Sequence, residues 1–527
     1  MRPAHPSISP ERVGGVDKRV WPMIALVAAF AVIIMKDISI SPVIMLGVGG
    51  LGLLGLFMTS LETPSIALYM LIAYLPFSRL LVGDFGTHTF ALNLTNILTI
   101  LIFIGYSVHQ SGKKDAGSRS NSPMNGLVWL FCFMGAVSLI KAGYQYGSWY
   151  IWELITPLKR WLTPVLFYFL ALWVVRDKRT LKTVVVLIMA VTAMVALMAI
   201  RDYMNVGDMN FESSRVGGIA EQPNTLGAFF VYYMFLFLGF FLIYAKRPKA
   251  WLLLIPLALC FRGIMVTFSR GAYLGFASGC LAAFFFRSKI TLLAILAVVA
   301  LLFTNPSLLP AGIRYRMGMT IEHPTTSMTL PGEDITETLE DSAAQRIEIW
   351  RTGLRIIKDH PWWGVGYGAF PFFLHEYSQG HFGYRDAHNS YLLIAAEMGI
   401  PTLVVFFLVL AAAFYYTYWL YRRTTDQTHK AIALGFLAGL FGLLVANMFG
   451  SRMDDQAVSS YFWILCGLII RAVLMEREAA GAGATVKVRA GSTAATAVMM
   501  APVVARKARG PLPAIEYDRL RRRIRRR

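Results

Sequence analysis

Residues 181–200 read LKTVVVLIMAVTAMVALMAI, and this stretch decides the fold class. It contains one charged residue, Lys182, over about 20 residues, the length that an α-helix needs to cross a bilayer. The whole chain is similar: 56% of its 527 residues are hydrophobic and 15% are charged, whereas soluble proteins have about 25% charged residues. We therefore predict an integral membrane protein and exclude a soluble enzyme, a disordered chain and a disulfide-stapled secreted scaffold.

Other stretches have a similar length and apolar character, which predicts an all-α polytopic protein with about 12–14 transmembrane helices. The first is interpreted as an anchor and not a signal peptide, because no small-residue cleavage site follows it. The predicted spans are 21–35, 41–58, 63–78, 93–108, 125–142, 157–175, 181–200, 226–245, 250–268, 271–286, 290–304, 400–421, 431–449 and 457–475.

The positions of lysine and arginine predict the orientation of these spans. Basic residues concentrate in the cytoplasmic loops of membrane proteins. If the N-terminus is cytoplasmic, fourteen spans place all the basic loop clusters on the cytoplasmic side and leave the opposite loops poor in basic residues. The clusters are Arg2/Arg12/Lys18/Arg19, Lys113/Lys114/Arg119, Arg176/Lys178/Arg179, Lys246/Arg247/Lys249, Arg287/Lys289, Arg422/Arg423/Lys430 and the C-terminal tail.

This pattern divides the chain into five parts. Residues 1–20 are predicted to be a cytoplasmic segment, 21–304 a transmembrane bundle, and 305–388 a long periplasmic loop that is too polar to span. Residues 389–475 are predicted to return to the membrane as the C-terminal transmembrane helices, and 476–527 to form a disordered cytoplasmic tail.

The basic tail accounts for much of the formal net charge of +20. Its residues 476–527 include 13 Lys or Arg and four Asp or Glu. Such a segment is attracted to the anionic lipids of the cytoplasmic leaflet. We therefore expect membrane lipids, and not nucleic acid, as its partner.

The long loop is predicted to contain short helices. Over residues 342–358, Ile347, Trp350, Leu354 and Ile357 recur at helical spacing, which predicts a helix with these four residues on one apolar face. Pro361 is expected to end it.

Several basic residues break the positive-inside pattern. Arg215, Arg270 and Arg452 lie in short outer loops, and Lys159 with Arg160 lies in the outer part of the predicted span 157–175. One interpretation is that they are snorkelling anchors, or ion pairs with acidic neighbours such as Glu221, Asp454 and Asp455. The other is an anionic-ligand site, because the planar guanidinium group suits phosphate oxygens.

Five of the nine histidines lie on the long loop, and His388 is the candidate for chemistry. It lies where the loop re-enters the membrane, and a neutral imidazole is a natural base for a hydroxyl group. A capping or loop histidine is the structural alternative. His375, Glu376, His381, Asp386 and His388 match no strong zinc spacing, and the four cysteines form no CxxC pair, so we expect no metal.

Residues 364–368, Gly-Val-Gly-Tyr-Gly, are similar to two functional motifs, the potassium-channel filter and the dinucleotide-binding loop. Neither context is present in the sequence around them. We interpret the glycines as residues that let the backbone turn beneath Trp362 and Trp363.

Taken in order, four motifs resemble the O-antigen ligase/polymerase family, the Wzy/WaaL-type group of bacterial polytopic glycosyltransferases. They are Arg215-Val-Gly-Gly with Pro223-Asn224; Phe268-Ser-Arg270-Gly; Arg346 and Trp350 with His360-Pro-Trp-Trp-Gly-Val-Gly-Tyr-Gly; and Asp386-Ala-His388-Asn-Ser-Tyr-Leu with Gly399-Ile-Pro401. The motifs cover about residues 210–410. The span number is higher than the usual number near twelve, and the basic tail is not part of the family pattern.

The resemblance implies a GT-C-like helical bundle that uses an undecaprenyl-diphosphate-linked glycan donor at the periplasmic face of the bacterial inner membrane, with neither metal nor cofactor. The acceptor is another glycan, a lipid A-core or a protein. The resemblance implies that Arg215 and Arg270 hold the diphosphate and that His388 activates the acceptor hydroxyl. Further substrate-binding candidates are Lys159, Arg160, Glu221, Asn224, Arg346, Tyr367, Asp386 and Asn389.

A transporter or flippase of lipid-linked glycans is the alternative from another functional class. Transporters place ionisable groups near the bilayer midplane, often on broken helices. Here the candidate groups gather towards one predicted face, although Arg262 and Glu397 lie deeper in the predicted arrangement. The sequence therefore favours the enzyme.

Overall fold

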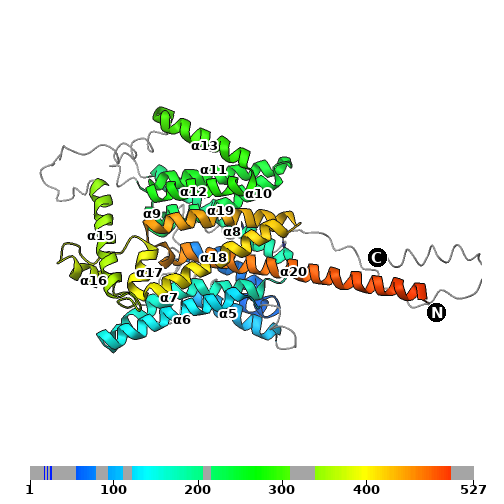
Figure 1. Ribbon diagram of the computed structural model, residues 1–527, viewed down its shortest axis with the longest axis horizontal. Coiled ribbons are helices and arrows are strands. Elements are labelled where there is room, and N and C mark those ends of the chain that lie inside the picture. Colours follow the sequence, from blue (N-terminus) through cyan, green and yellow to red (C-terminus); the bar gives the residue numbers. More distant parts are fainter. Residues whose placement is uncertain are drawn as a thin grey trace, which may run out of the picture. The chain divides into compact units, whose positions relative to one another are not determined.

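The computed structural model describes residues 17, 21, 24–25, 55–78, 93–110, 121–205, 215–308 and 339–499. Within these residues all regular secondary structure is helical (Figure 1), which confirms the predicted all-α class. Most of the predicted spans 21–35 and 41–58 lies outside the described residues. The helices begin with α3 (Pro64–Tyr74), η1 (Leu75–Phe77), α5 (Leu94–Gln110), α6 (Pro123–Tyr146), α7 (Ser148–Val174) and α8 (Lys178–Asn205).

The second half of the described chain continues in the same way. Its helices are η3 (Gly218–Ala220), α9 (Pro223–Tyr233), α10 (Phe235–Tyr244), η4 (Pro248–Leu253), α11 (Leu254–Thr267), α12 (Arg270–Arg287), α13 (Lys289–Thr304), η5 (Pro306–Leu308), α15 (Leu339–Asp359), α16 (Phe370–Tyr377), α17 (Ser390–Met398), α18 (Ile400–Arg423), α19 (Gln427–Ala446), η6 (Asn447–Phe449), η7 (Arg452–Asp454) and α20 (Gln456–Met499).

Seven helical segments in the described residues are long and apolar enough to cross a membrane, which agrees with a polytopic protein. They are Pro123–Tyr146, Lys178–Asn205, Pro223–Tyr244, Pro248–Thr267, Ile400–Arg423, Gln427–Phe449 and Gln456–Ala480. Two shorter apolar helices, Pro64–Phe77 and Leu94–Val108, also lie over predicted spans. Helices α7, α12 and α13 cover the remaining ones, and α7 begins at Ser148, well before the predicted start at residue 157.

Glycines allow close packing around α19, which contacts α9, α10, α12 and α18. Gly435, Gly439 and Gly442 lie on one face of α19, at i, i+4 and i+7. A Cβ atom at Gly435 would lie 2.7 Å from the carbonyl oxygen of Phe235, and one at Gly439 would lie 2.4 Å from that of Tyr232. The backbones of α9 and α10 therefore approach α19 as closely as small residues permit, a common device of membrane helices.

Helix α15 confirms the predicted helix over 342–358, but the predicted apolar face is wrong. Ile347 and Leu354 are 49% and 60% exposed, whereas Ile349 and Ile356 are buried. The reason is the close packing of α15 on α17: a Cβ atom at Gly353 would lie 2.5 Å from the Leu392 side chain. This approach turns the Ile349/Ile356 side of α15 inward. The other side stays exposed.

The Gly364–Gly368 segment turns the chain between α15 and α16. Gly364, Gly366 and Gly368 have φ angles of +61°, +108° and +77°, which a side chain would strain. The hydroxyl of Tyr146 on α6 donates to the carbonyl of Val365 at 2.7 Å, and the Val365 N–H donates to Ala396 at 2.8 Å. The segment therefore joins α6 to α17, which confirms its structural interpretation.

The chain divides into two compact units, Met1–Leu474 and Met475–Arg527. Helix α20 continues past their boundary to Met499, whereas we expected an irregular tail from residue 476. Alanine is frequent between residues 479 and 497 and has the highest helix propensity, which accounts for this difference. The remaining tail, 500–527, lies outside the described residues.

Candidate functional site

The first part of the candidate site lies where the chain enters α9 and α12. Arg215 donates from Nε to the carbonyl of Thr267 at 3.2 Å and from a terminal nitrogen to Oδ1 of Asn224 at 3.1 Å. Thr267 ends α11, and Arg270 begins α12 after a tight turn at Phe268 with φ +49°. The structure therefore brings together Arg215, Asn224 and Arg270, and the two guanidinium groups are close enough to repel each other.

Arg346 on α15 adds a third cation. Burial lowers the pKa of its guanidinium group, and the nearby positive charges of Arg270, Arg452 and Arg215 lower it further. Its side chain is half-buried, and it makes no hydrogen bond or ion pair with any described residue. Arginine side chains seldom lose water without a compensating acceptor. Arg346 thus adds a third positive charge beside Arg215 and Arg270.

His388 lies beside Asp386 at the start of α17. Its Nδ1 is 3.6 Å from Oδ2 of Asp386, and its backbone N–H donates to the same oxygen at 3.2 Å. The other oxygen of Asp386 accepts a hydrogen bond from the Ser451 hydroxyl at 2.9 Å. These contacts hold a histidine whose φ of +50° is unusual for a residue with a side chain.

The environment of His388 favours the neutral imidazole. Burial lowers its pKa, Asp386 opposes this shift, and the positive charges of Arg346, Arg452 and Arg385 reinforce it. The imidazole is therefore uncharged at neutral pH, the form that can accept a proton. The helix cap that we considered for His388 is supplied by Asn389, whose Oδ1 accepts from the N–H groups of Tyr391 and Leu392.

Arg452 was noticed in the sequence but not placed among the site residues, and the structure puts it next to them. It is 7% exposed, and its guanidinium group donates to Oγ1 of Thr225 at 2.7 Å. Its backbone N–H donates to the Ser390 hydroxyl, which itself donates to Asn447. Burial lowers its pKa, while the neighbouring groups Tyr232, Asp386, Asp455 and Asp454 oppose that shift. Arg452 therefore ties α9, α17 and η7 together within electrostatic range of His388.

A second group of predicted residues lies around Tyr367. This tyrosine packs on Trp161 with ring centroids 6.1 Å apart, and it lies within electrostatic range of Arg160 and Asp454. Lys159, next to Arg160 on α7, has a half-buried side chain. Asp454 also lies within range of Asp386, so this group borders the His388 region.

Glu397, which the sequence analysis did not place in the site, supports the segment that carries Tyr367. It is 5% exposed, and its Oε1 accepts from the N–H of Phe370 at 3.3 Å. Burial raises the pKa of its carboxyl group to about 8, and hydrogen bonds from backbone N–H groups limit the rise. No spacing signal in the sequence identified this contact, because its partner is a backbone atom 27 residues away.

Glu221 and His375, which the sequence analysis named, both lie in loops or at their edges. Glu221 lies on the exposed turn before α9 with φ 59°. His375 packs its ring on Tyr384 and places Nδ1 3.0 Å from the carbonyl of Phe382. Within the described residues, no three His, Cys, Asp or Glu side chains are grouped as metal ligands would be.

Comparison with known protein families gives a match to part of the chain that includes several candidate site residues. Residues 255–407 match the family model Wzy_C, described as O-antigen ligase. This part of the chain is similar to O-antigen ligases. The match confirms the resemblance to the O-antigen ligase/polymerase family, a family of membrane glycosyltransferases. The chain matches no curated protein and no solved structure.

The matched region covers part of the candidate site. Arg270, Arg346, Tyr367, Asp386 and His388 all lie within residues 255–407. Arg215, Asn224 and Arg452 lie outside this range and reach the site through the contacts of Thr267, Thr225 and Ser390. The candidate site thus includes residues from outside the matched region.

Proposed function

We propose that this protein transfers a glycan from an undecaprenyl-diphosphate carrier to an acceptor hydroxyl at the periplasmic face of the inner membrane. The single observation that carries the proposal is the group of four arginines beside one neutral histidine. Arg346 lies within electrostatic range of Arg215, Arg270 and Arg452, and also of His388. Such a group matches a substrate with a diphosphate next to the reacting atom.

The arginines stabilise the leaving group in this reaction. As the bond between the anomeric carbon and the diphosphate oxygen breaks, negative charge grows on the diphosphate. Fixed cations therefore stabilise the transition state more than the bound substrate. Guanidinium groups suit this role because they stay protonated at neutral pH and donate two parallel hydrogen bonds.

His388 accepts the proton of the acceptor hydroxyl as its oxygen bonds to the anomeric carbon. Nδ1 of His388 faces Asp386, so Nε2 is the nitrogen available for the proton. Asp386 stabilises the imidazolium that results. Base assistance of this kind contributes about 10²–10⁴ in rate.

The orientation supports a periplasmic site. The positive-inside rule places the N-terminus in the cytoplasm, and α18 then begins on the periplasmic side at Ile400, next to α17. No ATP is present there, and the energy-rich carrier diphosphate supplies the driving force. Lys159, Arg160 and Tyr367 lie where they would contact the glycan of the donor or acceptor.

Substitution of the charged residues tests the proposal. We expect Arg215→Ala, Arg270→Ala and His388→Ala each to abolish transfer, measured as surface polysaccharide on a gel, while the protein still inserts. Arg351→Ala is the matched control, because this arginine lies exposed on α15, five residues after Arg346. Normal polysaccharide from all three variants would overturn the assignment.

Deletion of the gene separates the two branches of the family. A ladder that collapses to a single repeat indicates a polymerase. A long polymer that stays on the carrier lipid indicates a ligase, with a lipid A-core or protein as acceptor. Loss of carrier-linked glycan from the periplasmic leaflet would instead indicate a flippase.

A further inference from the structure

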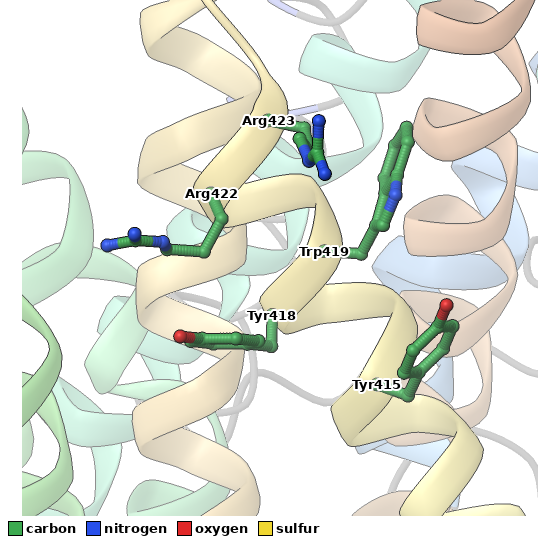
Figure 2. A pocket seen from close by; sticks show the side chains of 5 residues that line it. All are labelled: Tyr415, Tyr418, Trp419, Arg422 and Arg423. Carbon is green, nitrogen blue, oxygen red and sulfur yellow. The ribbon is translucent and has the colours of Figure 1, made fainter.

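The C-terminal end of α18 has a hollow that the proposed reaction does not use. It has a volume of about 410 Å³ and is lined by Tyr415, Tyr418, Trp419, Arg422 and Arg423 (Figure 2). In Figure 2 Arg422 and Tyr418 project to one side of α18, Tyr415 and Trp419 lie on the other side, and Arg423 lies at the helix end. The hollow therefore combines two positive charges with an aromatic wall.

The described residues do not neutralise the charges of this hollow. Arg422 and Arg423 are exposed, and neither forms an ion pair with a described residue. The nearby carboxylate of Asp426 is occupied, because it binds Lys178 at 3.1 Å and caps α19. The partial negative charge at the end of a helix, about half an elementary charge, is smaller than the two full positive charges.

The position of the hollow points to the membrane surface. Helix α18 has 24 residues, so at about 1.5 Å per residue it is about 36 Å long, slightly more than a hydrocarbon core of about 30 Å. Its first residue, Ile400, adjoins α17 and the candidate site, so the hollow lies at the headgroup level of the opposite leaflet. Tyrosine and tryptophan concentrate at this level of the membrane.

We propose that the hollow binds the phosphate-bearing headgroup of an anionic phospholipid. Arg422 and Arg423 donate hydrogen bonds to the phosphate oxygens, and Tyr415, Tyr418 and Trp419 pack against the glycerol and the upper acyl chains. Basic pockets at the ends of membrane helices bind anionic lipid headgroups in this manner. The proposal depends only on α18 crossing the membrane and is independent of the transfer reaction.

Lipid titration of the purified full-length protein tests this site. Native mass spectrometry compares phosphatidylglycerol with phosphatidylcholine of the same acyl chains. We expect the wild-type protein to retain phosphatidylglycerol preferentially. Each arginine removed should weaken its binding about fivefold, and Arg422→Gln/Arg423→Gln should therefore weaken it more than tenfold.

A second double variant controls for bulk charge. Arg176→Gln/Arg179→Gln removes the same charge from the turn before α8 and from the first turn of α8, which the Lys178–Asp426 ion pair places at the same end of the bundle; Arg179 pairs with Asp17 at 3.4 Å. It should keep the lipid preference of the wild type. Equal losses in both double variants, no preference for phosphatidylglycerol, or displacement of the lipid by millimolar inorganic phosphate would each overturn the proposal. Thermal unfolding checks that all variants remain folded.

Discussion

Two substitutions beside His388 should shift its pKa in opposite directions. A general base loses activity on the acidic side of the pH profile, where it becomes protonated. Asp386 favours the protonated imidazole, whereas the positive charge of Arg346 disfavours it. Asp386→Asn should therefore lower the pKa of His388 and move the acidic limb to lower pH. Arg346→Gln should raise that pKa and move the limb to higher pH.

The structure sets the size of the Asp386 effect. Two unit charges 3.6 Å apart, the separation of His388 Nδ1 and Asp386 Oδ2, interact by about 1 kcal/mol at the dielectric constant of water. The water value is appropriate because the two side chains are 40% and 43% exposed. Since 1.36 kcal/mol corresponds to about one pH unit, the limb should move by somewhat less than one unit.

The assay is the pH dependence of kcat/KM for glycan transfer by the purified protein with its carrier-linked donor. Arg351→Gln is the matched control for Arg346→Gln, because it removes the same charge from the exposed side of α15. A reduced maximum rate in the Arg346 variant does not disturb the test, because the position of the limb is read separately. Limbs that move in the same direction in both variants, or that do not move, would refute the role of His388 as base.

Two further predictions concern the backbone segment that supports the site and the type of positively charged group within it. Gly366→Ala should destabilise the fold by about 1–3 kcal/mol, because the φ of Gly366 is +108° and the new Cβ atom would lie 2.6 Å from that of Ala142. Gly383→Ala is the control and should have little effect, because no atom lies within 4 Å of its new Cβ atom. Thermal unfolding in detergent measures both variants, and equal losses of stability would contradict this account. Arg270→Lys should lower kcat/KM about tenfold or more, because an ammonium group cannot replace a bidentate guanidinium group. Full activity of Arg270→Lys would show that any positive charge suffices there.

The bundle was predictable from the sequence because the length of an apolar stretch reports directly on a membrane helix. Residues 181–200, for example, lie within α8, and 400–421 lie within α18. The inward face of α15 was not predictable. It depends on the close approach of Gly353 to Leu392, a contact between residues that are 39 positions apart. The helical spacing of Ile347, Trp350, Leu354 and Ile357 contains no information about Leu392.

The candidate site was predictable only where a motif or an out-of-place charge marked it. Arg215 and Arg270 carried both signals, His388 lay in a motif, and all three lie within electrostatic range of Arg346. The contacts of Arg452 with Thr225 and Ser390 could not be predicted, because they join helices 227 and 62 residues apart. Glu397 is a similar case. The sequence shows one carboxylate on an apolar helix, but it does not show which backbone N–H groups donate hydrogen bonds to that carboxylate.

Binding of undecaprenyl diphosphate without its glycan is the most direct measure of the arginine group. The purified wild-type protein and the variants Arg215→Ala, Arg270→Ala and Arg346→Ala would be titrated with this carrier, with Arg351→Ala as the control. We predict that each of the three variants binds the carrier at least tenfold more weakly than the wild type and the control do. Unchanged Kd values in all three variants would contradict the assignment of these arginines to the diphosphate.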